Sequence, residues 1–386
     1  MVNKRQIARR TKETLSAEEC SEIAVKAITR NLTISINGTL QPKRIIQSLV
    51  GMSANRLSVH SITTAVKKVP CETSFRYHLS KIDLDTIQEI QSKILTYSQD
   101  TILRPGKSFY FAIDFTNDPY YGEIVEANQD YVIKSKMEDS TTKFYSYVSL
   151  SIITKGQRLT LAVFPTKKGV SKVEYLRRFL KIIVDLNVKI TVLCLDRGFY
   201  SKEVFGFLQN GDVPHIVPVK KQGGELKKIL TGNHSRYDRY TMIGNGKDPI
   251  DLTLAIDVQY LQGKNGKHGN VNLGYVVHGI DWNPRKVSSV YKNRFAIESS
   301  YRIRNIVKAR TSSRNVVLRY LLTIISFLLK NVWVALQRIC FSRMHRGPVT
   351  IDVDLFRFDL FRLFVWEGIR NTLKPITFVA VLRRLS

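Results

Sequence analysis

The chain has 386 residues, of which 44% are hydrophobic and four are cysteine, and its formal net charge is +28. So large an apolar fraction speaks against a disordered protein, and four widely separated cysteines speak against a disulfide framework or a Cys-x-x-Cys zinc site. The basic excess is spread along the chain, which favours nucleic acid as the partner over an anionic membrane surface.

The segment 1–105 is predicted to be a helical domain that binds DNA. Ser16 and Glu19 have the spacing of a capping box at a helix start. Two short helical patterns on either side of Pro70 are typical of a helix-turn-helix, although an ordinary helical hairpin gives the same pattern. In a helix-turn-helix the second helix would turn five side chains toward a DNA groove: Ser74, Arg76, Tyr77, His78 and Lys81.

From residue 106 the pattern becomes that of an α/β domain. Three strand patterns, "SFYFAID" ending in Asp114, "YVSLSII" and "LTLAVFP", precede a helix and the strand "KITVLCLD", which ends in Asp196. A further helix and the strand "HIVPVK" follow. This order predicts a mixed sheet with antiparallel and parallel parts. Residues 222–282 are strand-like and rich in loops, and we interpret them as a β-rich insertion.

Helical patterns return from about residue 286. The apolar stretch "YLLTIISFLLKNVWVAL" is predicted to be a buried helix, because Arg319 and Lys330 leave about ten apolar residues between them, too few to span a bilayer. We therefore expect no membrane span. After a break at "HRGP", residues 345–348, the segment 341–386 is expected to be a C-terminal helical extension.

Three carboxylates stand where a metal site could form. Asp114 and Asp196 each end a predicted strand of one sheet, and neighbouring strands can bring such ends together. Glu298 shares one face of a predicted long helix with Tyr291, Arg294, Tyr301, Asn305 and Lys308. Crowded carboxylates repel one another, and Mg²⁺, which prefers oxygen ligands, removes that repulsion. Each also has an ordinary interpretation: a strand-end Asp as a cap, and Glu298 in an ion pair with Arg294 or Arg302.

The three acidic segments, in this order, resemble those of the DDE transposases of insertion sequences, over roughly residues 106–340. "FAIDFTNDPYYG" is similar to the first-aspartate segment of that family and "VLCLDRGFYS" to the second. "YKNRFAIESSYRIR" resembles the third-acid helix of a bacterial and archaeal subgroup named for Tyr, Arg, Glu and Lys at fixed spacing. Tyr291, Arg294 and Glu298 match this signature, whereas Asn305 stands where the Lys is expected, so that Arg304 or Lys308 would take its role.

The resemblance implies a ribonuclease H-like catalytic core at 106–340 and a cut-and-paste transposase. The enzyme would cut DNA at the ends of its element and join the freed ends to target DNA. Asp114, Asp196 and Glu298 would hold Mg²⁺ or Mn²⁺, as two ions in the family pattern. Contacts to DNA are expected from Arg76 and Lys81 and, near the third acid, from Tyr291, Arg294, Tyr301, Arg302, Arg304 and Lys308.

The partners implied are double-stranded DNA, at terminal inverted repeats and at the target, and a second copy of the chain in the DNA complex. A cytoplasmic, nucleoid-associated protein is expected. Two alternatives stay open: a domesticated or inactive transposase that only binds DNA, and a nuclease of the same core that cuts without joining strands.

Overall fold

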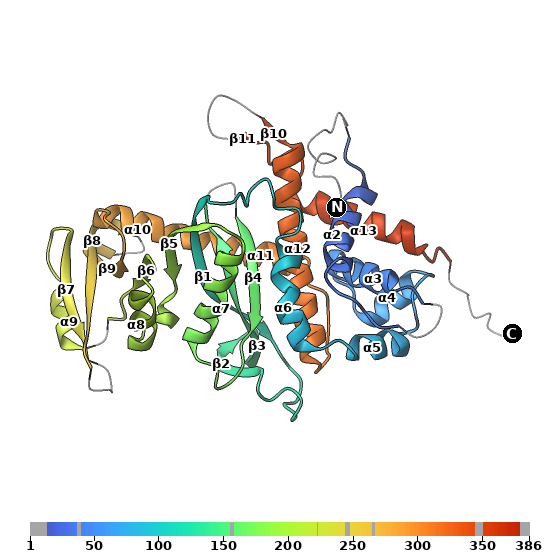
Figure 1. Ribbon diagram of the computed structural model, residues 1–386, viewed down its shortest axis with the longest axis horizontal. Coiled ribbons are helices and arrows are strands. Elements are labelled where there is room, and N and C mark those ends of the chain that lie inside the picture. Colours follow the sequence, from blue (N-terminus) through green and yellow to red (C-terminus); the bar gives the residue numbers. More distant parts are fainter. Residues whose placement is uncertain are drawn as a thin grey trace. The chain divides into compact units, whose positions relative to one another are not determined.

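The computed structural model describes residues 14–36, 40–154, 158–221, 223–243, 248–264, 267–343 and 350–378. They fall into two compact units (Figure 1). One unit, Gln99–Arg302, contains the large sheet and is called the sheet unit. The other, the helical unit, combines the residues up to Ser98 with those from Ile303 onward. The sheet unit thus ends at Arg302, whereas the sequence placed the end of a catalytic domain at residue 340.

The core of the sheet unit is a mixed sheet, as the sequence predicted. Its first six strands are β1 Ser108–Pro119, β2 Val132–Glu138, β3 Thr141–Ile152, β4 Leu159–Pro165, β5 Lys189–Leu195 and β6 His215–Pro218. Strand β3 pairs antiparallel with β1, β2 and β4, and β5 pairs parallel with both β1 and β6. The buried, β-branched and aromatic residues of β1, β3 and β4 explain why these segments take the centre of a sheet.

The insertion extends this sheet. It contains α9 Gly224–Ile229, β7 Arg236–Met242, β8 Ile250–Lys264 and β9 Lys267–His278. Strand β9 pairs antiparallel with β6, β8 with β9, and β7 with β8, which gives a nine-stranded sheet. The insertion therefore shares backbone hydrogen bonds with the strands of the core.

Three helices of the sheet unit, and the part of a fourth that precedes Ile303, cover the sheet. Helix α7, Lys172–Asp185, packs on β4 and β5, and α8, Lys202–Asn210, packs on β8 (Figure 1). Helix α10, Pro284–Lys292, packs on β8 and β9, and α11, Ala296–Ile306, follows it. One hydrophobic cluster joins α10 and α11 to β1, β5, β6, β8 and β9; it includes Ala112, Cys194, Ile216, Val287 and Ile297.

Three details of the sheet unit differ from the sequence-based prediction. Strand β1 runs past Asp114 to Pro119, because its pairing with β3 continues to the partners Pro119 and Phe144. Strand β2 was missed, since its residues "VIKSKME" are mostly exposed and show no apolar alternation. The predicted long helix is two helices, because a 3₁₀ turn, η2 Asn293–Phe295, separates α10 from α11.

The helical unit packs its N-terminal helices against its C-terminal ones. Its helices are α2 Ala17–Thr29, α3 Pro42–Ala54, α4 Val59–Ala65, α5 Glu72–Ser80, α6 Leu84–Leu95, α12 Val316–Cys340 and α13 Phe358–Leu373. The predicted capping box of Ser16 and Glu19 is present at the start of α2. Helix α13 packs on α2 and α3, and a Cβ at Gly368 would lie 2.4 Å from the carbonyl oxygen of Ala17, so this close approach requires glycine.

Helix α12 is the buried helix that the sequence predicted, but it is longer than expected. Its 25 residues are long and apolar enough to cross a membrane by length and composition alone, and 89% of its most apolar window is buried inside the protein. Burial of that kind is typical of a core helix. Two two-residue strands, β10 Ser342–Arg343 and β11 Thr350–Ile351, follow it. The break predicted at 345–348 lies outside the described residues.

Candidate active site

Asp114 and Asp196 lie side by side at one edge of the parallel strand pair. The register of β1 and β5 ends with the partners Ile113 and Leu195, and the two aspartates are the residues that follow. Side chains alternate between the faces of a sheet, so Asp114 shares its face with Ala112 and Asp196 shares its face with Cys194. Ala112 and Cys194 belong to the cluster beneath α10 and α11, so both carboxylates are directed to that face.

Two side chains from the turn and helix above reach the first aspartate. Arg294, in η2, donates from Nη1 to Asp114 Oδ2 at 2.7 Å, and both residues are buried. The Tyr301 hydroxyl, on α11, donates to the Asp114 carbonyl oxygen at 3.3 Å and lies 2.9 Å from Ser149 Oγ. Ser149 is the cross-strand partner of Asp114 in β3. Arg294 of η2 and Tyr301 of α11 thereby hold these two elements over the strand position that carries Asp114.

The two aspartates of this site have raised pKa values. The pKa of Asp114 is raised to about 6. Burial is the largest cause, Arg294 opposes it, and the negative charges of Asp196 and Glu298 add to the rise. Burial also raises the pKa of Asp196, although Arg294 and the Gly198 amide, 2.8 Å from Asp196 Oδ1, oppose that rise. Two neighbouring negative charges therefore raise the pKa of Asp114, and the buried Arg294 guanidinium opposes them.

A cavity of about 460 Å³ opens beside Asp196. Its wall carries the cationic side chains of Arg197, Lys221, Lys292 and Arg294, together with the rings of Tyr275, Tyr291 and Phe295. The Nε of Arg294 is buried and has no hydrogen-bond partner among the described residues. A cavity that combines a carboxylate with several cations suits a phosphodiester held next to an acidic centre.

The donor set fits a divalent cation. Carboxylate oxygens are the ligands that Mg²⁺ prefers. Burial, and to a smaller extent the charges of Asp196 and Glu298, raise the pKa of Asp114, and a bound cation would offset both effects. Among the described residues no three His, Cys, Asp or Glu side chains already form a metal-binding group. Glu298 is exposed on α11, and Arg294 supplies the positive charge at Asp114.

The predicted DNA-contacting residues near Glu298 are placed in different environments. Arg302 is exposed and Lys308 is half-buried. Tyr291 is 6% exposed within the core cluster, and its ring lies 5.4 Å from the Arg294 guanidinium. Tyr301 is half-buried against Asp114 and Ser149, as described above.

Arg304 is fully buried in the helical unit. Its guanidinium donates to Thr323 Oγ1 at 3.2 Å and to Ser326 Oγ at 3.1 Å, both on α12. A side chain so enclosed ties the last turn of α11, which belongs to the helical unit from Ile303 onward, to α12, and it is not free to contact DNA. The prediction that Arg304 contacts DNA was wrong. In a run of several basic residues, the sequence does not show which side chain is buried.

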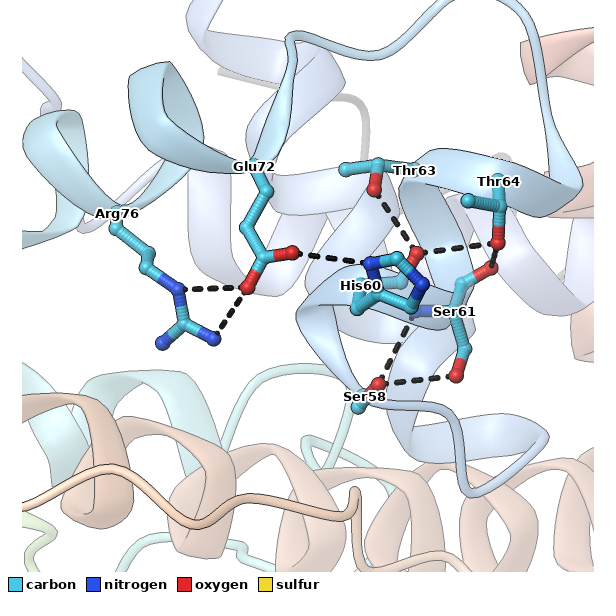
Figure 2. Close-up of polar contacts among 7 residues, drawn as sticks. All are labelled: Ser58, His60, Ser61, Thr63, Thr64, Glu72 and Arg76. Atoms are coloured by element: carbon cyan, nitrogen blue, oxygen red, sulfur yellow. Dashed lines mark hydrogen bonds and ion pairs between the residues drawn. The ribbon is translucent and has the colours of Figure 1, made fainter.

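The predicted helix-turn-helix corresponds to α4 and α5. Glu72 accepts from Arg76 at 2.6 Å and is 3.2 Å from His60 Nδ1, so one carboxylate joins the two helices (Figure 2). Arg76 and Lys81 are exposed, as predicted, and Lys81 Nζ lies 4.2 Å from the centre of the Tyr77 ring. His78 is buried at 5% exposure, which corrects the prediction that it faces outward.

Sequence reasoning missed Ser149, Arg197, Lys221 and Lys292 as parts of the site. Arg197 and Lys292 adjoin motif residues, and adjacency to Asp196 and Tyr291 was the one signal that pointed to them. Ser149 and Lys221 reach the site only through strand register and through the insertion, which the sequence pattern does not specify.

Comparison with known proteins finds a matching family model and related solved structures. The model of the transposase DDE domain matches residues 110–328, more than half of the chain. A cryo-EM structure of the piggyBac transposase synaptic complex with hairpin DNA matches with a TM-score of 0.53 and 11% sequence identity, over 95% of this chain and 83% of that chain. That likeness concerns the fold, which is ribonuclease H-like as predicted. No curated protein sequence matches.

Proposed function

The chain belongs to the transposase DDE domain family, and we propose that this transposase cuts DNA at the ends of a mobile element and joins the freed ends to target DNA. The observation that supports the proposal most is the pairing of Asp114 and Asp196 beneath η2 and α11, beside a cavity lined by cations. Asp114, Asp196 and Glu298 would be the catalytic acids. This assignment extends the family membership to individual residues.

The three acids would hold Mg²⁺ or Mn²⁺, most simply as two ions in the manner of phosphoryl-transfer enzymes. When bound, such ions activate the attacking oxygen and stabilise the leaving oxygen of a phosphodiester. The chain's own residues would do the positioning. Arg197, Lys221 and Lys292 would hold the phosphate backbone, and Arg294 would keep Asp114 charged and oriented.

The helical unit would bind the terminal inverted repeats through α4 and α5. Exposed Arg76 on the second helix and exposed Lys81 at its C-cap are suited to phosphates or to guanine edges. Two ends must be held together for cut-and-paste transposition, so we propose a homodimer in the DNA complex. We assign the protein to the subgroup with the Tyr, Arg, Glu and Lys signature, with Lys308 in place of the expected Lys, and to the cytoplasm.

The test is cleavage of a supercoiled plasmid that carries the gene's native flanks, with Mg²⁺ or Mn²⁺. Asp114→Asn, Asp196→Asn and Glu298→Gln should each abolish cutting while DNA binding survives, because each keeps the side-chain shape and removes a ligand charge. Asp185→Asn on α7 and Glu203→Gln on α8, both exposed, are the matched controls and should cut normally. Cutting by all three site variants would refute the assignment. Cutting without joined products would favour a nuclease of the same core.

A further inference from the structure

The turn that follows Asp196 determines how its carboxylate is oriented. This 3₁₀ turn, η1 Arg197–Phe199, begins directly after strand β5 and has Asp196 as its N-cap. The Gly198 amide donates to Asp196 Oδ1 at 2.8 Å, and the Phe199 amide donates to the Asp196 carbonyl oxygen at 3.1 Å. The carboxylate therefore takes its direction from the backbone of η1, and any shift of the turn would move it.

One side of η1 packs on the strand that carries Asp114. The Phe199 ring is fully buried and stacks on the Phe115 ring, with 5.1 Å between the ring centroids. Phe115 directly follows Asp114, and side chains alternate between the faces of a strand. The ring stack thus joins the segments of the two aspartates on the face of β1 opposite to the Asp114 carboxylate.

A second contact to η1 comes from Lys172, the first residue of α7. Its Nζ donates to the Gly198 carbonyl oxygen, although the two residues are 26 positions apart. A cation in the first turn is unfavourable for a helix, because the positive end of the helix dipole lies there, whereas Glu174 in the same turn has the favourable sign. The stability of α7 therefore does not explain this lysine, and its contact with Gly198 does.

We propose that Lys172 is a positioning residue for DNA cleavage, which fixes η1 through the Gly198 carbonyl oxygen and thereby orients the Asp196 carboxylate. The same turn carries Arg197, which lines the cavity beside Asp196. Lys172 would thus set the spacing between a ligand of the cation and a contact to the DNA phosphate. The proposal rests on the proposed function, which assigns the cation to Asp196.

The first test is a Mn²⁺ titration of the full chain, with the electron paramagnetic resonance signal of free Mn²⁺ as the measure of the unbound ion. Lys172→Met removes the donor and the charge from an exposed side chain, so the variant should fold. Loss of a positive charge alone would favour Mn²⁺ binding, since it removes a repulsion. We expect the opposite, binding about 10-fold weaker than in wild type, because the partner that orients a ligand is lost.

Two further variants serve as the controls for this titration. Lys172→Arg keeps a charged donor and should restore Mn²⁺ affinity to within about threefold of wild type. Lys181→Met makes the same change at another exposed position of α7 and should match wild type. Mn²⁺ binding by Lys172→Met that equals or exceeds that of wild type would overturn the proposal.

Gly198→Ala tests whether Lys172 acts through the turn. A Cβ at this position would lie 2.8 Å from Asp196 Oδ1, so the carboxylate would have to move, and Mn²⁺ binding should weaken as in Lys172→Met. The double variant should be little worse than either single one, because both changes disturb the same carboxylate. Additive losses would mean that Lys172 acts independently of η1 and would overturn the proposal.

Cleavage kinetics separate positioning from contact with DNA. Lys172→Met should lower kcat about 10-fold and leave KM for DNA within about twofold of wild type. A higher KM, a salt dependence reduced by about one phosphate contact and unchanged Mn²⁺ affinity would make Lys172 a DNA contact and overturn the proposal. Weakened Mn²⁺ binding in Asp196→Asn but not in Lys172→Met would refute this inference and leave the proposed function intact. Equal Mn²⁺ affinity of wild type and Asp196→Asn would refute both.

Discussion

The surroundings of Asp114 have opposing effects on its pKa. Its own burial and the charges of Asp196 and Glu298 favour the protonated form, and Arg294 at 2.7 Å favours the ionised form. The net effect is a pKa of about 6, against an ordinary value of 3.8. The fold thus keeps a carboxylate where it is partly protonated near neutral pH, a state that a bound cation would convert to the ionised form.

The first prediction concerns the pH dependence of stability in the metal-free protein. The pKa of Asp114 is higher in the folded state than in the unfolded state, so the stabilising contribution is complete below about pH 4 and is lost as the pH rises through about 6. Between pH 5 and 7 wild type should lose on the order of 1 kcal/mol of unfolding free energy relative to Asp114→Asn. Urea unfolding of both proteins at each pH measures this difference.

Addition of Mg²⁺ provides the control for that prediction. If Asp114 is a ligand, the cation favours its ionised form and should reduce the pH-dependent loss in wild type without affecting Asp114→Asn. An identical pH dependence in the two proteins would show that Asp114 does not titrate in this range.

The second prediction separates positioning from chemistry at Tyr301. Its hydroxyl contacts the Asp114 carbonyl oxygen and Ser149, so Tyr301→Phe should cost about 1 kcal/mol of stability and reduce DNA cleavage about 10-fold. Ser149→Ala removes the other end of the same contact, and the double variant should be little worse than either single one. Additive losses in cleavage would mean that Tyr301 acts on DNA directly.

At the scale of elements, the pair of helices α4 and α5 contains one carboxylate, Glu72, that partly neutralises its basic side chains. Glu72 is bound to both His60 and Arg76, and these contacts lower its pKa, with Arg76 the largest cause (Figure 2). An arginine engaged in this way is less available to phosphate. The same carboxylate also repels DNA, so its removal affects binding in two ways.

The third prediction follows: Glu72→Gln should raise affinity for double-stranded DNA about three- to tenfold at low salt, because it frees Arg76 and removes one negative charge. Fluorescence anisotropy with a labelled duplex measures the change. Glu89→Gln on α6 removes an exposed charge of the same kind outside α4 and α5, and it should change affinity less. Equal effects of the two substitutions would place the DNA surface elsewhere in the helical unit.

Element boundaries also show what could be predicted from sequence. Strands β1, β4 and β5 contain mainly apolar runs, and β3 alternates apolar residues with serines; both patterns identify strands by themselves. The 3₁₀ turn at 293–295 has neither proline nor glycine, so nothing local marked the break between α10 and α11. Burial of Arg304 and His78 depends on tertiary partners, which periodicity does not reveal.

The candidate active site was predictable in part, because its two aspartates follow apolar strand patterns. Asp114 and Asp196 follow apolar runs that end at one sheet edge, so their pairing follows from the strand order. The contacts of Arg294 with Asp114 and of Tyr301 with Ser149 span more than 150 residues and depend on how η2 and α11 settle on the sheet. The spacing of apolar residues within a segment contains no information on contacts between segments so far apart in the sequence.

At the scale of the whole molecule, the net charge of +28 governs how the protein meets DNA. The fourth prediction is that duplex affinity falls at least about 10³-fold between 50 mM and 200 mM salt, as for a protein that neutralises about six or more phosphates. A titration across salt concentrations measures the slope. A slope near zero would contradict a DNA interface built mainly on the basic residues.

The central claim is that Asp114, Asp196 and Glu298 act as one metal site, and Glu298 is the member that the structure leaves exposed. The most direct test is a Mn²⁺ titration of wild type, Glu298→Gln and the control Glu203→Gln. The electron paramagnetic resonance signal of free Mn²⁺ measures the unbound ion at each step. Loss of a ligand should weaken Mn²⁺ binding at least about 10-fold in Glu298→Gln, and Glu203→Gln should match wild type. Equal affinity in all three proteins would contradict the claim and return Glu298 to the role of a surface carboxylate.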